Sequence, residues 1–203
     1  PGGEILAYIR YQRWKLPDDA PELATDQRLY SAPGAPTDLG QAVFQHSAFS
    51  SSLDGGKSWA PPRLVTGSAQ QSGSLVRLSD GTLIMTFGRY GQRFMLSYDD
   101  GQTWGKAVYQ LYPCGQYARS IALDDDTIVT VHDNRETWGF QGRVLRCYNN
   151  TLVSDGITDT PRQLGVLRWR APSRSRVESQ GFFTPRQAEA GIKEMGRKLE
   201  PGR

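Results

Sequence analysis

The chain has 203 residues, enough for one domain with a sizeable core, and its 22 glycines and 12 prolines are typical of a turn-rich β protein. No apolar run approaches the roughly 18 residues of a membrane span, and no segment reads as a signal peptide. The net charge of +3 is uneven, since residues 161–203 carry ten Lys or Arg and four Asp or Glu. This basic tail lacks a dense basic run, which argues against nucleic-acid binding and favours a solvated face.

The first third of the chain predicts two strands separated by a loop. Residues 4–11 alternate well enough to form a strand. Residues 14–38 hold four prolines among polar residues and predict a long loop or insertion. Residues 42–50 predict a strand that leads into a turn motif. Because the chain opens like the middle of a repeat, we expect it to be a piece of a longer protein.

Two copies of one turn motif start 97 − 52 = 45 residues apart. The Asp can accept hydrogen bonds from turn amides, the Gly permits an unusual backbone angle, and the hydroxyls tie the turn ends. The Trp is expected to bury its ring against the neighbouring strand. We predict a structural role for the motif residues, which are Ser52, Asp54, Gly56, Ser58 and Trp59 in the first copy and Ser97, Asp99, Gly101, Thr103 and Trp104 in the second.

Repeated hairpins surround the second motif. Residues 74–79 and 82–87 predict a strand pair across an Asp-Gly turn, with residues 93–98 as the next strand. The same strand–turn–strand pattern recurs at residues 120–123 and 127–132, and residues 142–148 are predicted as the third strand. Residues 164–170 predict a last strand.

The remaining residues, 171–203, predict a basic C-terminal tail. A Thr-Pro-Arg-Gln signature at residues 184–187 favours a helix over residues 185–199, with a frayed tail as the alternative. An amphipathic stripe with steps of four, three and four residues supports the helix.

The two motifs resemble the Asp-box repeat of the sialidase (neuraminidase) superfamily, and their spacing fits four-stranded propeller blades. The resemblance implies an all-β fold, a six-bladed β-propeller of about 270 residues. Residues 1–170 would then supply about half of such a propeller, or form an incomplete one.

Two further segments are similar to sialidase sequences, at residues 78–89 and 117–125. The resemblance implies that Tyr117 is a nucleophile, because a neutral phenol avoids repulsion by the substrate carboxylate. Arg89 and Arg119 would grip that carboxylate, and Asp133 or Glu136 would be the acidic partner of Tyr117. His132 is interpreted as a turn or mouth residue. No cofactor and no metal site is implied.

Several functions remain open at this point. The first is a sialidase-like glycoside hydrolase that removes terminal sialic acid or a related sugar from glycoconjugates, secreted or extracytoplasmic, with activity belonging to the full-length protein. The second is a non-catalytic Asp-box propeller that binds glycan or protein. A third is an Asp-box family without sialic acid specificity. Upstream sequence would discriminate between the first two.

Overall fold

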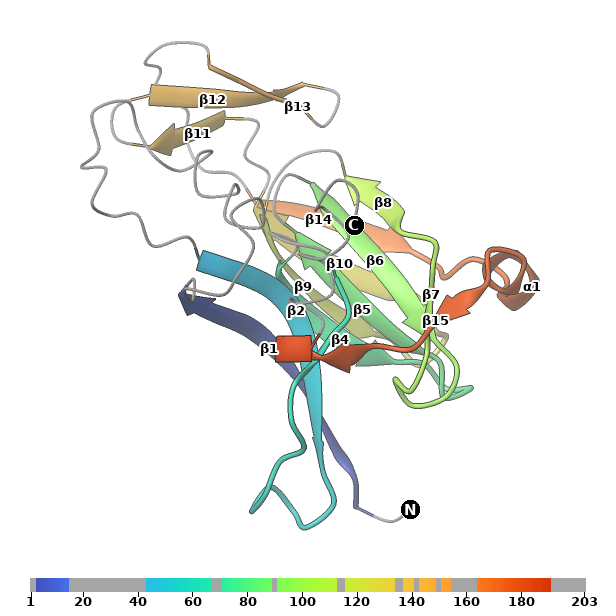
Figure 1. Ribbon diagram of the computed structural model, residues 1–203. Helices are drawn as coiled ribbons and strands as arrows, with labels where there is room; N and C mark the ends of the chain where they lie inside the picture. Colours follow the sequence, from blue (N-terminus) through green and yellow to red (C-terminus); the bar gives the residue numbers. More distant parts are fainter. Residues whose placement is uncertain are drawn as a thin grey trace. The chain divides into compact units, whose positions relative to one another are not determined.

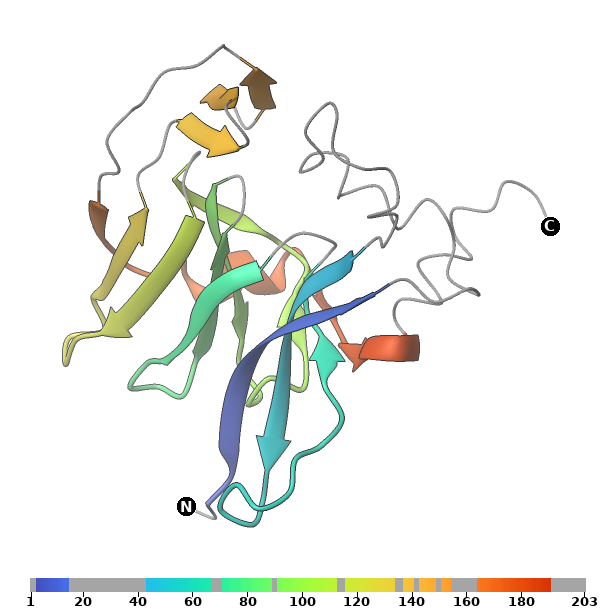
Figure 2. The same ribbon diagram turned by 90° about the vertical axis from the view of Figure 1, so that its left-hand side faces the viewer.

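The protein, seen in a computed structural model, is built of antiparallel β-sheets with little helix, which confirms the all-β expectation (Figures 1 and 2). The structure describes residues 3–14, 43–66, 71–88, 91–112, 116–133, 137–140, 143–148, 151–154 and 164–190. The chain divides into two compact units, residues 1–71 with 186–203 and residues 72–185.

The first unit contains a four-stranded sheet in the order β1-β2-β3-β16. Its strands are β1 (Ile5–Trp14), β2 (Val43–Ser52), β3 (Arg63–Leu64) and β16 (Arg186–Gln187). A small apolar cluster of Ala48, Leu64 and Ala188 holds this sheet together. The strands expected at residues 4–11 and 42–50 are confirmed, whereas the predicted loop beyond Trp14 lies outside the described residues.

The second unit is organised around a four-stranded sheet in the order β4-β5-β6-β8. Its strands are β4 (Gln71–Arg77), β5 (Leu83–Gly88), β6 (Gln92–Ser97) and β8 (Tyr109–Tyr112). Every residue of β5 is buried, as its continuous apolar run predicts for a strand covered on both faces. The predicted hairpin and the strand after it are therefore confirmed.

A three-stranded sheet in the order β14-β10-β9 packs against this sheet. Its strands are β9 (Gln116–Ala122), β10 (Ile128–Asp133) and β14 (Leu164–Trp169). The prediction that residues 142–148 form its third strand is wrong, because β14 takes that place beside β10. Those residues form β12 (Arg143–Tyr148), which pairs instead with β11 (Thr137–Phe140) and β13 (Thr151–Ser154).

Apolar packing joins the two sheets of the second unit. The Phe94 ring lies 4.4 Å from the Trp169 ring and 5.0 Å from the Tyr109 ring, measured between centroids. The fully buried side chains of Ile84 and Ile128 belong to the same cluster. Since large aromatic side chains bury much apolar area, this contact contributes to the cohesion between the sheets.

The β4–β5 and β9–β10 turns repeat each other at the atomic level. The amide of Leu78 donates to the carbonyl of Thr82 at 2.9 Å, and that of Leu123 donates to Thr127 at 2.8 Å. The two turns are 123 − 78 = 45 residues apart, the same spacing as the two Asp-Gly-Trp motifs. The repeat inferred from sequence is thus a repeat of structure.

The two turn motifs form equivalent hydrogen bonds. In the second, Asp99 accepts from the Ser97 hydroxyl at 2.9 Å and from the Thr103 amide and hydroxyl at 2.8 and 2.6 Å. In the first, Asp54 accepts from the corresponding groups of Ser52 and Ser58 at 2.8, 2.9 and 2.6 Å. The Asp side chain therefore staples each turn, as the sequence suggested.

The tryptophans of the two motifs differ in burial. Trp104 is 1% exposed, whereas Trp59 is 45% exposed, so the expected burial is wrong for the first motif. Trp104 begins β7 (Trp104–Gly105), which pairs with β15 (Phe182–Phe183) from the C-terminal segment. Strand β15 therefore buries the Trp104 ring, which the motif residues alone would leave exposed.

The C-terminal segment departs from the predicted helix. Arg186 and Gln187 are in β16, so the helix predicted at residues 185–199 does not start at its Thr-Pro signature. Pairing with β3 satisfies this backbone in place of a helical turn. Residues 188–190 are helical, and residues 191–199 lie outside the described part. A helix that was not predicted, α1 (Arg174–Glu178), buries Val177 in the core of the second unit.

Candidate functional site

Tyr117 occupies a β-bulge near the start of β9. The register pairs Val131 with Arg119 and Asp133 with Gln116, so Tyr117 and Ala118 together lie opposite the single residue His132. Bulges of this kind bend a strand and redirect a side chain. The Tyr117 side chain is 55% exposed, although tyrosine is a large and partly apolar residue.

The backbone of Tyr117 is in the left-handed region, with φ of +55°. Among the described residues, the other non-glycine residues with positive φ are Asp100 and Asp126, which occupy turns and are of a type that tolerates this conformation. For a bulky side chain the same φ costs free energy, and such strain is commonly found at functional positions. The backbone thus marks Tyr117 as unusual independently of its sequence context.

Arg119 follows Tyr117 on the same strand and is bonded to the neighbouring sheet. Its Nη1 donates to the carbonyl of Gly73 at 2.6 Å and to that of Ala118 at 3.0 Å. Gly73 lies in β4, so this guanidinium links the first strands of the two sheets. Since a guanidinium carries five N–H donors, Arg119 has further donors for a ligand.

A ladder of buried hydroxyls supports the same strand. Ser120 Oγ lies 2.8 Å from Thr130 Oγ1 and donates to Thr86 Oγ1 at 3.2 Å, while Trp169 Nε1 donates to Thr130 at 2.9 Å. Ser74 Oγ completes the ladder by accepting from the Ser120 amide at 2.8 Å. Satisfied polar networks in a low-dielectric interior rigidify the structure around them. Sequence reasoning missed this ladder, although the recurrence of Ser and Thr in both hairpins was a usable signal.

His132 lies opposite the bulge and is 2% exposed in strand β10, so its interpretation as a turn or mouth residue is wrong. Its ring centroid lies 4.8 Å from that of Tyr112. Gly165 makes room for it, because a Cβ there would come within 2.5 Å of Nε2. His132 therefore packs beneath the bulge as a core side chain.

The structure brings together part of the predicted site. Tyr117 and Arg119 share one strand, and the backbone of Asp133 lies opposite Gln116, the residue before Tyr117. The side chain of Asp133 is outside the described part of the chain, as are Arg89 and Glu136. Their predicted roles remain predictions.

Nowhere in the described ranges do three or more His, Cys, Asp or Glu side chains gather closely enough to hold a metal ion. No helix there has the length and apolar character needed to cross a membrane.

Comparison with known proteins found no match, either among protein-family models or among curated proteins. The interpretation of the site therefore rests on its own residues.

Proposed function

We propose that this chain is part of an Asp-box β-propeller, and that the full-length protein is a sialidase-like glycoside hydrolase that binds a terminal acidic sugar at Tyr117 and Arg119. Two stacked antiparallel sheets with turns repeating every 45 residues support the propeller. The proposal for the site rests on one observation, the exposed Tyr117 held in a left-handed bulge.

The chemistry suits a substrate with its own carboxylate. In the proposed reaction the Tyr117 oxygen bonds to the anomeric carbon as the glycosidic bond breaks, and its proton passes to a carboxylate. Asp133 is the candidate base, since its backbone lies across from Gln116. A separate general acid would protonate the departing oxygen. Arg119 would hold the substrate carboxylate through donors that its two backbone contacts leave over.

The test is hydrolysis of an aryl sialoside by the full-length protein and by its Tyr117→Phe variant. Loss of the nucleophilic oxygen is expected to lower kcat at least about a hundredfold. Tyr109→Phe is the matched control, because the Tyr109 hydroxyl is buried and has no hydrogen-bond partner within the described ranges. Undiminished turnover in Tyr117→Phe would remove Tyr117 from the mechanism.

A second function, a non-catalytic glycan-binding propeller, is favoured by the contacts of Arg119. Its guanidinium donates to two backbone carbonyls and so acts as a strap between sheets, which limits its reach toward a ligand. Saturable binding of a sialoside to the full-length protein without turnover of any linkage would support this function over hydrolysis.

A further inference from the structure

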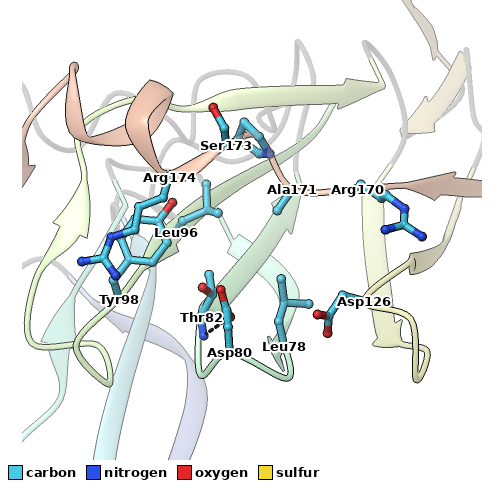
Figure 3. A pocket seen from close by; sticks show the side chains of 11 residues that line it. Leu78, Asp80, Thr82, Leu96, Tyr98, Asp126, Arg170, Ala171, Ser173 and Arg174 are labelled. Atoms are coloured by element: carbon cyan, nitrogen blue, oxygen red, sulfur yellow. Dashed lines mark hydrogen bonds between the residues drawn. The ribbon is translucent and has the colours of Figure 1, made fainter.

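A cavity of about 280 Å³ lies in the second unit, at the turn ends of its two packed sheets (Figure 3). Leu78 and Asp80 reach it from the β4–β5 turn, and Leu96 reaches it from β6. Pro172 reaches it from the segment between β14 and α1, and Arg174 reaches it from the first position of α1. It is separate from the Tyr117 site, because Tyr117 is near the start of β9 while Asp126, which lines the cavity, is in the turn that follows the other end of that strand.

The cavity has one carboxylate suited to accept from a ligand. Asp80 accepts from the Thr82 amide at 2.8 Å and makes no ion pair among the described residues. Hydrogen bonds from Thr82 hold the pKa of Asp80 below its usual value, with a smaller contribution from the positive charge of Arg174. Asp80 is therefore ionised at neutral pH. Figure 3 shows its side chain directed into the cavity.

Arg174 is the corresponding donor. Its Nε donates to Glu178 at 2.7 Å, and its guanidinium lies over the Tyr98 ring at 4.7 Å. Its terminal nitrogens have no hydrogen-bond partner in the described part of the chain. The Tyr98 hydroxyl is buried and has no hydrogen-bond partner among the described residues either. A buried polar group left without a partner is unfavourable, and a ligand hydroxyl that reached it would offset that cost.

Charge balance and the apolar wall restrict the ligand class. Two guanidinium groups line the cavity, and each is already paired with a carboxylate outside the lining, Arg170 with Asp125 at 2.9 Å and Arg174 with Glu178 at 2.7 Å. An anion would therefore gain little here, whereas a neutral ligand can donate to Asp80 and accept from the remaining guanidinium donors without disturbing either pair. Because a hydroxyl both donates and accepts, neighbouring hydroxyls can satisfy a carboxylate and a guanidinium together. Leucine and proline side chains would pack against C–H groups of the same ligand.

We propose that this cavity is a binding site for one neutral sugar residue, with hydroxyls that donate to Asp80 and accept from Arg174. The site does not depend on the function proposed for Tyr117, because it uses other residues at the other end of the strands.

The test is an amide NMR titration of the 203-residue chain with methyl glucoside, methyl galactoside and methyl mannoside. We expect at least one of them to cause saturable shifts at the amides of residues 78–82 and 170–174. Asp80→Asn and Arg174→Gln should each weaken binding by about tenfold or more. Asp80→Asn keeps an oxygen for the Thr82 amide, so the turn should still form. Asp100→Asn is the matched control, since it removes the same charge from an exposed turn outside the cavity.

Three results would overturn the proposal. One is the absence of saturable shifts at these amides with all three sugars up to about 50 mM, well above the millimolar range of a weak site. Another is equal affinity in the cavity variants and the Asp100→Asn control. The last is saturable binding of the zwitterion glycine betaine where the sugars fail. Shifts confined to residues near Tyr117 are a case of the first result, because none appears at the cavity amides, and they would leave the proposed function standing.

Discussion

Asp99→Ala tests whether the turn motif contributes to stability. The substitution removes a carboxylate that accepts three hydrogen bonds, from Ser97 Oγ and from the amide and hydroxyl of Thr103. Ser97 is fully buried and Trp104 is 1% exposed, so water cannot readily replace the lost acceptor. At about 1 kcal/mol net for each bond, less what the Thr103 hydroxyl regains from water, the loss is about 2 kcal/mol.

Asp54→Ala is the matched comparison. Asp54 accepts the same set of hydrogen bonds, but its turn is solvated, with Leu53 82% and Trp59 45% exposed. Water can satisfy the Ser58 amide and hydroxyl that the substitution releases, whereas Ser52, like Ser97, is buried. We therefore expect a clearly smaller loss of stability at Asp54 than at Asp99.

Urea unfolding followed by both tryptophan fluorescence and circular dichroism measures these losses. Two probes are needed because the chain has two compact units, and separate transitions would invalidate a single free energy of unfolding. Asp99→Asn should fall between wild type and Asp99→Ala, because its amide keeps one oxygen acceptor. Equal losses for the two alanine variants, or a loss below about 0.5 kcal/mol for Asp99→Ala, would refute the reasoning.

Two further predictions concern stability at low pH and the close approach of strands β4 and β5 at Gly73. Hydrogen bonds, first from the Ser58 hydroxyl, lower the pKa of Asp54 from 3.8 to about 2. A carboxyl whose pKa is lowered in the folded state adds stability at pH values above its unfolded-state pKa, and this stability is lost as pH falls through the folded-state pKa. The thermal melting temperature should therefore fall between about pH 4 and pH 2, and Asp54→Asn should show a smaller fall. Gly73→Ala should lower the free energy of unfolding by at least about 3 kcal/mol in urea, because the added Cβ would overlap the Thr86 carbonyl. Gly3→Ala is the control and should leave that free energy unchanged, because the space around Gly3 is open. A neutral Gly73→Ala would mean that β4 and β5 can separate without loss.

Local patterns predicted the turns and hairpins well, because the groups that make them are close in sequence. Asp99 is bonded to residues two and four positions away, and the Leu78 amide reaches a carbonyl four positions on. The turn residues differ more than their backbones do. Asp126 takes the place of Gly81 one repeat earlier, and both have positive φ. Asp tolerates this conformation, so the repeat survives the substitution.

The pairing of strands that are far apart in the sequence could not be predicted in the same way. Both β12 (Arg143–Tyr148) and β14 (Leu164–Trp169) carry strand-forming residues after β10, and alternation alone cannot say which pairs with it. Trp169 decides between them, since its ring packs on Phe94 and its Nε1 donates to Thr130. Those contacts depend on the neighbouring sheet. The bulge at Tyr117 was equally hidden, because tyrosine has no preference for positive φ.

The different burial of Trp59 and Trp104 shows where local sequence stops determining structure. Gly105 follows Trp104 and lies against Val177, since a Cβ at Gly105 would come 3.0 Å from Val177 Cγ1, and Phe183 pairs with Trp104 itself. After the first motif, β16 pairs with β3, beyond Trp59, and leaves that ring 45% exposed. The motif specifies the turn conformation, while residues far along the chain determine how much of the turn is exposed to solvent. Since a hydrogen bond matters most where water cannot replace it, the same eight-residue motif gives a stability determinant at Asp99 and a solvated turn at Asp54.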